Sequence, residues 1–210
     1  MKFLSFILLL LSIVSAQDLS PTEVLKKIQS RYSGMNDASA SFTQTVNLRF
    51  KKNGQQNVGT VKIKKGNKYR LETNQQTIVT DGKTVWMYTP ATKQVLKDTF
   101  KQNRQPFSPD KFLLGLPKEF SATHVEKDSQ YVVLSLQPTK TGSTTSLILA
   151  LKVWVNPETW IFEKIEITDK NSTTTTISLS SIVFNKGIAE KDFQFEISGD
   201  MNIVDLTKLQ

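Results

Sequence analysis

The sequence predicts a mainly β protein with a few helices, built around a meandering antiparallel sheet that is curled or barrel-like. Short segments with the alternating apolar and polar pattern of strands recur along most of the chain. Turn signals such as Asp81-Gly82 separate these segments at hairpin spacing. Only two segments carry the start signals of a helix. Regularly spaced short strands joined by such turns are typical of curled antiparallel sheets and barrels.

The chain opens with the features of a secretory signal peptide. Lys2 precedes an almost unbroken apolar run from Phe3 to Val14, and Val14-Ser15-Ala16 fits a small-residue cleavage site. The run is too short to cross a membrane of roughly 30 Å as a stable helix. We therefore expect residues 1–16 to be removed on export and residues 17–210 to form a single domain. The alternative is a retained N-terminal anchor.

The first helix is predicted to begin just after this leader. Ser20 has the position of an N-cap, Pro21 fits the first helical position, and Glu23 completes a capping box with Ser20. Apolar residues then recur on one face of the helix, and Ser33-Gly34 marks its end. We expect an amphipathic helix that lies on an apolar surface.

Strand segments make up most of the remaining chain. In the first of them, the phase that contains Phe42 is apolar and the opposite phase is polar. Lys51–Gly54 is predicted to turn the chain into the second. A short helix at Pro109–Leu114, broken by Gly115 and Pro117, interrupts the series once. The expected strands are Ala40–Phe50, Val58–Lys64, Tyr69–Thr73, Thr77–Val79, Val85–Tyr88, Gln94–Leu96, Phe120–Val125, Tyr131–Leu136, Leu147–Val155, Trp160–Thr168 and Thr174–Phe184.

The strand Val85-Trp86-Met87-Tyr88 raises a question of cover. Side chains of a strand alternate between its two faces, yet all four of these are apolar. Both faces of this strand should therefore be covered. A neighbouring helix or sheet can cover one face, and the sequence leaves open what covers the other.

The strands carry more large apolar side chains than a sheet with one buried face needs. One interpretation is an ordinary core between the sheet and its two helices. The other is a curved sheet whose concave face forms an apolar cavity, covered by the 109–114 helix when empty and by a ligand when full. A short helix interrupted by glycine and proline is weakly held, which suits a lid. The residues concerned are Phe42, Tyr69, Leu71, Trp86, Tyr88, Leu134, Trp154, Trp160 and Phe162.

Catalytic and metal-binding patterns are missing from the sequence. There is no cysteine, which excludes disulfides and cysteine metal sites, and no nucleophile-elbow, zincin, Walker A or dinucleotide-binding pattern occurs. His124 is the only histidine and has no nucleophile signature near it. We expect no enzyme activity, no cofactor and no metal, although a carboxylate pair of the glycosidase type stays open.

The net charge of +8 is strongly basic, and removal of Lys2 with the leader would lower it by one. A basic exported protein is not expected to meet nucleic acid. We expect instead an acidic partner, such as an anionic membrane surface, a lipid head group or an acidic patch on a protein.

Several short motifs follow one another along the chain: Ser39-Ala40-Ser41-Phe42-Thr43-Gln44, Gly59, the basic pair Lys64-Lys65, and Asp81 to Pro90, which reads D-G-K-T-V-W-M-Y-T-P. The tail adds Asp192-Phe193-Gln194-Phe195, then Gly199 and Ile203-Val204-Asp205. In this order they resemble the periplasmic lipoprotein carrier family of diderm bacteria (LolA-like). The resemblance spans nearly all of the chain after the leader.

The resemblance implies an unclosed antiparallel β-barrel with helices as a lid over a cavity that holds the acyl chains of lipoproteins. It also implies a periplasmic, monomeric carrier that takes lipoproteins from an inner-membrane ABC-type releasing complex and delivers them to an outer-membrane acceptor. A periplasmic binding protein for another lipid or glycolipid is the alternative. The side chains expected to bind acyl chains are Phe42, Tyr69, Leu71, Trp86, Tyr88, Phe112 and Leu113.

One departure from the family concerns closure of the lid. The family's basic residue that precedes a proline, and that is thought to hold the lid closed, aligns with Lys65. Here Gly66 follows in place of proline, and lysine replaces arginine. A lysine cannot make the planar, forked hydrogen bonds of a guanidinium. Lys65 is therefore expected either to close the lid or to be a solvated hairpin residue.

Overall fold

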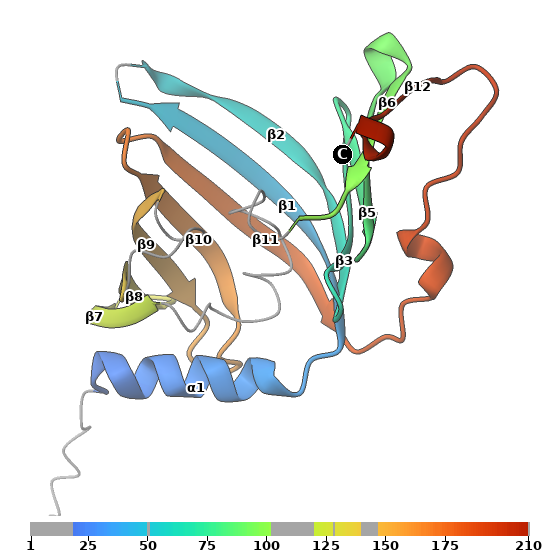
Figure 1. Ribbon diagram of the computed structural model, residues 1–210. Coiled ribbons are helices and arrows are strands. Elements are labelled where there is room, and N and C mark those ends of the chain that lie inside the picture. The colour runs from blue at the N-terminus through green and yellow to red at the C-terminus, as the bar shows by residue number, and fades with distance from the viewer. Residues whose placement is uncertain (1–18, 50, 102–119, 128, 140–146, 210) are drawn as a thin grey trace, which may run out of the picture.

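The computed structural model describes residues 19–49, 51–101, 120–127, 129–139 and 147–209, and in this part of the chain all strands belong to one curled sheet of twelve (Figure 1). Their order across the sheet is β12-β6-β5-β4-β3-β2-β1-β11-β10-β9-β8-β7. The strands are β1 (Asp37–Leu48), β2 (Lys51–Lys64), β3 (Lys68–Thr73), β4 (Thr77–Asp81), β5 (Thr84–Thr89), β6 (Gln94–Thr99), β7 (Phe120–Lys127), β8 (Val132–Pro138), β9 (Ile148–Val155), β10 (Phe162–Asp169), β11 (Thr174–Phe184) and β12 (Asn202–Asp205).

The sheet does not close into a barrel. β7 and β12 stand at its two ends, and every neighbouring pair is antiparallel except β12 and β6, which run parallel. The predicted fold class, a mainly β protein with an unclosed, curled antiparallel sheet, is confirmed. The short helix predicted at 109–114 lies outside the described residues, as does the predicted signal peptide.

The helix α1 (Pro21–Ser33) lies across one end of the curled sheet (Figure 1). Its predicted start is confirmed, because the Ser20 side chain accepts from the Glu23 backbone and the Glu23 carboxylate accepts from the Ser20 backbone at 2.8 Å. Glu23 is held as a carboxylate by this contact, since hydrogen bonds from Ser20 lower the pKa of its side chain. The helix ends at Gly34, again as predicted.

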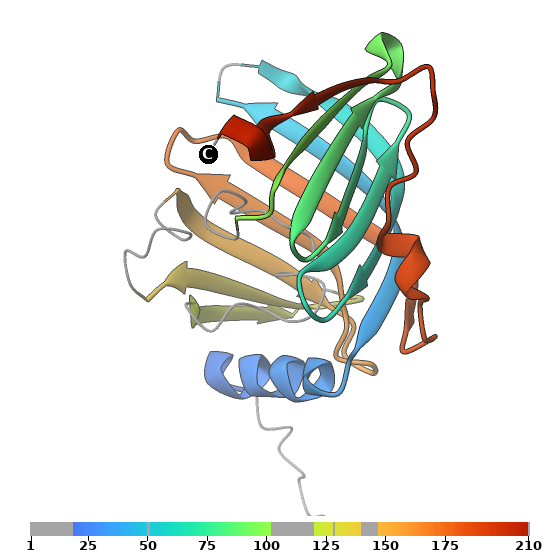
Figure 2. The same ribbon diagram turned by 45° about the vertical axis from the view of Figure 1, so that its right-hand side comes forward.

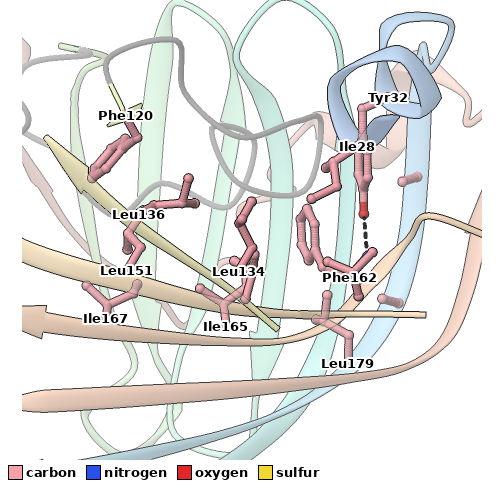
Figure 3. Close-up of a cluster of buried hydrophobic side chains, with 14 of the residues drawn as sticks. Ile28, Tyr32, Phe120, Leu134, Leu136, Leu151, Phe162, Ile165, Ile167 and Leu179 are labelled. Atoms are coloured by element: carbon pink, nitrogen blue, oxygen red, sulfur yellow. Dashed lines mark hydrogen bonds between the residues drawn. The ribbon is translucent and has the colours of Figure 1, made fainter. Parts of the chain in front are cut away.

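Tyr32 fixes the last turn of α1 on the sheet. Its ring stacks on Phe162, with ring centres 4.9 Å apart, and meets Phe184 edge-on. Its hydroxyl accepts the backbone N–H of Phe162 at 3.2 Å (Figure 3). Burial raises the pKa of the Tyr32 phenol, so this side chain is a neutral anchor.

The main core lies between α1 and the concave face of the sheet. Figure 3 shows Ile28 and Tyr32 reaching from the helix toward Phe162. The larger fully buried side chains of this cluster come from β2, β8, β9 and β10 as well as from α1. They are Val24, Ile28, Ile63, Leu134, Leu136, Leu151, Phe162 and Ile165, and the connection between α1 and β1 adds Met35.

The first hairpin departs from the sequence prediction. Lys51–Gly54 was expected to be a turn, but β2 already begins at Lys51, and Val46 pairs with Gln55. The prediction is wrong because Gly54 serves a close approach of two strands. A Cβ at this position would collide with the carbonyl oxygen of Val46, beside a register shift in β1.

The hairpin between β4 and β5 confirms the Asp81-Gly82 turn signal. Asp81 Oδ1 accepts the backbone N–H groups of Lys83 at 2.8 Å and of Thr84 at 2.7 Å. Gly82 has a φ of +90°, a conformation that favours glycine. This turn sets the register in which Ile78 faces Met87 and Val79 faces Trp86.

The C-terminal segment (residues 186–205) covers the outer, convex face of β2–β6. Figure 2 shows it passing outside these strands before β12 joins β6. It brings in Phe193, which is fully buried at the end of the 3₁₀ helix η3 (Glu190–Phe193). The ring of Phe195 follows, with its centre 5.9 Å from that of Tyr88. The C-terminal segment therefore covers the outer face of β5 at Tyr88.

Ion pairs connect the C-terminal segment to basic residues of the sheet. Four of its carboxylates, Glu190, Asp192, Asp200 and Asp205, have lowered pKa values, and we call these four the segment carboxylates. Hydrogen bonds from Lys68 to Glu190, Lys62 to Asp192, Ser198 to Asp200 and Thr207 to Asp205 are the main causes, and the pKa of Asp205 falls to about 2. The pairs are Lys62–Asp192 (2.5 Å), Lys64–Glu190 (2.9 Å), Lys68–Glu190 (2.6 Å), Lys93–Asp200 (2.9 Å) and Lys97–Asp205 (3.1 Å).

Asp37 anchors the start of the C-terminal segment. Its buried carboxylate accepts the backbone N–H groups of Lys186 at 2.9 Å, Gly187 at 3.1 Å and Ile188 at 3.3 Å. Gly187 has a φ of +71°, which lets three successive N–H groups converge on one side chain. Asp37 therefore joins the first residue of β1 to the point where the chain leaves β11.

Candidate functional site

A cavity of about 330 Å³ lies on the concave face, between β1–β4 on one side and β10–β11 on the other. Eight of its lining residues are apolar, and none of the described residues that line it is charged. The apolar residues are Phe42, Val61, Leu71, Ile78, Ile165, Ile167, Ile177 and Leu179. The polar ones are Gln44, Asn57, Thr73, Gln75, Gln76 and Thr175.

Strand pairing places these side chains together. Phe42 of β1 stands opposite Gly59 of β2 and Leu179 of β11, so three strands meet at its ring. A Cβ at position 59 would collide with the carbonyl oxygen of Glu72 and lie 3.0 Å from the Phe42 ring. Glycine at this position leaves room for the ring on the cavity wall.

The polar lining residues lie at one end of the cavity, beyond the apolar lining residues along β1 and β2. Gln44 and Asn57 face each other two positions beyond Phe42 and Gly59, and Asn57 Nδ2 donates to Gln44 Oε1 at 3.5 Å. Gln75 and Gln76 lie in the turn between β3 and β4. The cavity therefore has a long apolar part and an uncharged polar end.

Two of the residues predicted to bind acyl chains line this cavity and a third adjoins it. Phe42 is buried and Leu71 is half-buried, and both face the hollow. Tyr69 lies two positions from Leu71 on the same face of β3 and is buried in the core. Phe112 and Leu113, the two residues predicted on the lid, fall among residues 102–119, outside the described part of the chain.

Trp86 and Tyr88 lie on the opposite face from this cavity. Met87 pairs with the cavity residue Ile78, so its neighbours in β5 point to the convex side. There Tyr88 contacts Phe195 and lines a separate, more polar pocket of about 520 Å³ beneath the C-terminal segment. The sequence pattern could not assign their face, because every position of the strand is apolar.

Lys65 lies in the turn between β2 and β3, beside the connection from α1 to β1. Its ammonium donates to Asn36 Oδ1 at 3.2 Å, and its backbone N–H donates to the Asn36 carbonyl at 2.9 Å. The residues predicted to form the lid are not described, so its role in lid closure stays a prediction.

Sequence reasoning missed most of the far wall of the cavity. Ile165 and Ile167 of β10, together with Ile177 and Leu179 of β11, line it. Their i, i+2 spacing carried the same signal that identified Phe42. This spacing alone does not place them on the cavity, because nothing local shows that two strands so distant in sequence face β3 and β4 across a hollow.

His124, the only histidine in the sequence, lies in the described part of the chain. His124 is exposed on β7, with its Nε2 atom 3.5 Å from a carboxylate oxygen of Glu126. Within the described ranges, no group of three or more His, Asp or Glu side chains could hold a metal ion. No helix among the described residues is long and apolar enough to cross a membrane.

Comparison with known proteins identifies relatives of this chain. The family model described as "Outer membrane lipoprotein carrier protein LolA" matches residues 33–196. The outer-membrane lipoprotein carrier protein of Haemophilus influenzae is 30% identical over 206 residues, which cover 94% of this chain and 95% of that protein. The protein of the same description from Pasteurella multocida is 38% identical over 90 residues, 40% of this chain and 44% of its own length. The crystal structure of an uncharacterized conserved protein from Thermus thermophilus matches this chain with a TM-score of 0.55 and 11% sequence identity. The match covers 88% of this chain and 98% of that protein, and it shows a similar fold and nothing more.

Proposed function

Because this chain belongs to the outer membrane lipoprotein carrier family, we propose that it is a periplasmic carrier that holds the acyl chains of lipoproteins in the concave cavity. The observation that carries this proposal is the hollow itself, which is lined by eight apolar side chains and by no charged side chain among the described residues. Such a lining favours a hydrocarbon chain as its ligand, because binding removes apolar surface of both the ligand and the cavity wall from water.

The volume of the cavity fits reversible binding. An engineered cavity of about 150 Å³ takes up benzene, with six carbons, so 330 Å³ corresponds to about a dozen carbon atoms. Twelve methylenes at about 0.8 kcal/mol each give roughly 10 kcal/mol before the costs of binding. This is well below the ceiling of about 18 to 21 kcal/mol for non-covalent binding. The chain can therefore be held and still be released to an acceptor whose own cavity is more apolar.

The roles of individual residues follow from their positions. We propose that Phe42, Tyr69 and Leu71 contact the acyl chain or the wall that holds it. Trp86 and Tyr88 lie on the outer face instead, where Tyr88 contacts Phe195 of the C-terminal segment. Phe112 and Leu113 keep their proposed role as part of a lid, which Lys65 closes.

The proposed route begins at an inner-membrane ABC-type releasing complex and ends at an outer-membrane acceptor. No nucleotide or metal is required in this chain, because energy enters at the releasing complex. The uncharged polar end of the cavity would also accept another neutral lipid or glycolipid, which is the second candidate cargo. Mass spectrometry of the material that co-purifies with the native protein from the periplasm separates the two.

A pair of neighbouring positions on β11 tests whether the cavity is the binding site. Ile177 lines the cavity, whereas Ser178 is exposed on the opposite face. Ile177→Glu places a charge against the hydrocarbon and should abolish lipoprotein retention, and Ser178→Glu should leave it unchanged. Equal retention by both variants, with thermal unfolding showing that both are folded, would remove the concave cavity as the site.

A further inference from the structure

The end of the molecule that carries α1 has exposed basic side chains without acidic partners. Lys26, Lys27 and Arg31 are exposed on the helix itself. Lys65 lies beside the connection from α1 to β1, and Lys186 donates its backbone N–H to the first residue of β1. None of these five side chains forms an ion pair with another residue in the described part of the chain. We call them the α1-end cations.

Basic residues on the outer face of the sheet are arranged differently. Five lysines there each pair with one of the segment carboxylates within 3.1 Å. Two exposed carboxylates at the α1 end, Glu23 and Glu158, offset only part of the charge of the α1-end cations. Lys27 and Arg31 are four residues apart, so their like charges repel each other across one turn of the helix. A negatively charged surface outside the protein would relieve this repulsion.

An aromatic side chain stands beside these charges. The Nζ atom of Lys27 lies 4.7 Å from the centre of the Trp160 ring. Trp160 is half-buried in the turn between β9 and β10, and its φ of +56° is a conformation that a bulky residue rarely adopts. Strain of this kind is typical of sites where a side chain has to be held in one place. Tryptophan is enriched where a membrane meets water, because its ring is apolar and its N–H is polar.

We propose that this end of the protein docks on an anionic membrane surface. The α1-end cations lie against the phosphate groups of the lipids, and Trp160 lies at the level of the head groups. α1 lies across the end of the curled sheet (Figure 1), so its exposed face can approach a bilayer side-on. An acidic protein would match the charges equally well, whereas the indole beside them favours a bilayer. This docking site goes beyond the carrier function, because it does not involve the concave cavity.

Co-sedimentation with vesicles tests the docking. The protein is purified from the periplasm, so that the predicted leader does not contribute to binding. One set of vesicles contains equal parts of phosphatidylglycerol and phosphatidylcholine, and the other contains phosphatidylcholine alone. We expect binding to the anionic vesicles only, and its loss at about 1 M salt, where charges are screened beyond about 3 Å. Equal binding to both vesicles would overturn the proposal. Binding to neither would also overturn it, and would leave an acidic protein as the partner of the α1-end cations.

Two double variants with the same net charge separate this end from the charge of the whole protein. Lys27→Gln/Arg31→Gln should weaken binding to anionic vesicles about 25-fold, since each basic residue near an anionic surface contributes a factor of about five. Lys170→Gln/Lys208→Gln removes exposed lysines from the β10–β11 turn and from the C-terminal end, which lies far from α1 (Figure 1), and should leave binding nearly unchanged. Equal weakening by both would show that net charge alone drives binding and would refute the site.

The same two variants distinguish docking from the carrier function. Both should keep the affinity of wild-type protein for the neutral acyl probe ethyl dodecanoate, measured by displacement of a fluorescent fatty-acid analogue. Thermal unfolding confirms that both are folded. If ethyl dodecanoate binds to neither variant nor to wild-type protein, acyl binding in the cavity is refuted while docking stands. If vesicles do not bind but the probe does, docking is refuted and the carrier function stands.

Trp160 provides a readout that is specific to a bilayer. The chain has three tryptophans, so Trp86→Phe/Trp154→Phe leaves Trp160 as the only one. With this variant shown to be folded, the fluorescence of Trp160 should shift to shorter wavelength on addition of anionic vesicles. Phospholipids brominated near the head group should quench it. Unchanged fluorescence of vesicle-bound protein would refute the placement of Trp160 at the membrane surface.

Discussion

Replacing Asp37 should release the C-terminal segment from the sheet. Asp37 is only 4% exposed, and its carboxylate accepts hydrogen bonds from the backbone N–H groups of residues 186–188. Asp37→Ala removes all three acceptor contacts. At about 1 kcal/mol net for each hydrogen bond, the free energy of unfolding should fall by about 3 kcal/mol.

The loss should appear in two independent measurements. For a chain of this length, 1 kcal/mol corresponds to roughly 2–4 °C in Tm, so Asp37→Ala should lower Tm by about 6–12 °C. Hydrogen exchange at the amides of residues 186–188 should accelerate roughly a hundredfold if the segment opens locally, since each 1.4 kcal/mol is a factor of about ten. Asp37→Asn keeps one acceptor oxygen and should lose about half as much.

Asp200→Ala is the matched control, because it removes a carboxylate of the same segment whose side chain is 62% exposed. Exposed ion pairs contribute little to stability, so this variant should leave Tm and hydrogen exchange close to those of the wild type. If Asp37→Ala behaves like Asp200→Ala in both Tm and exchange, the backbone contacts of Asp37 do not hold the segment and the reasoning is refuted.

Three further predictions concern the two faces of the sheet. Gly59→Ala should lower the free energy of unfolding by more than about 1 kcal/mol, measured by urea denaturation, because its Cβ collides with the backbone at Glu72; an unchanged value would contradict the close approach. Trp86→Glu should reduce Tm but leave the affinity for ethyl dodecanoate unchanged, since Trp86 faces away from the cavity; loss of binding in a folded variant would return Trp86 to the site. Lowering the pH from 5 to 2 should loosen the C-terminal segment, measured by hydrogen exchange of residues 190–205. Because the pKa values of the segment carboxylates are lowered in the folded protein, these groups stabilise the fold fully at pH values above their unfolded-state pKa values of 3.8 to 4.5. This stabilisation is lost as the pH falls through their folded-state pKa values, which reach about 2 for Asp205. Unchanged protection at pH 2 would show that the ion pairs do not hold the segment.

Local sequence signals were sufficient for the elements whose causes are local. The start of α1 depends on Ser20, Pro21 and Glu23, which are neighbours in sequence, and the β4–β5 turn depends on Asp81-Gly82. Strand phase was equally readable wherever one face is polar, as in β1. These features confirm that capping and alternation are properties of short stretches of chain.

The cover of β5 and the far wall of the cavity depend on residues distant in sequence. Tyr88 could not be assigned to a face, because the ring that covers it, Phe195, lies 107 positions later in the chain. Lys62 and Asp192 are both visible as charged residues in the sequence, yet only the fold brings them to 2.5 Å. The order and curvature of the strands likewise decide which apolar side chains line an unfilled cavity, and no single strand shows this.

The arrangement of the two faces explains how the protein can keep a hollow and remain folded. The C-terminal segment covers β2–β6 from outside, so these strands are held in place although side chains leave part of the concave face unfilled. At the slope of about 24 cal/mol per Å³ found for closed cavities in protein cores, an empty volume of 330 Å³ corresponds to about 8 kcal/mol. This is close to the roughly 10 kcal/mol that a dozen buried methylenes would supply. The stability given up by leaving the cavity unfilled is therefore of the same size as the transfer free energy that the proposed cargo would supply before the costs of binding. When the cargo leaves, the fold is still stabilised by the C-terminal segment on its outer face.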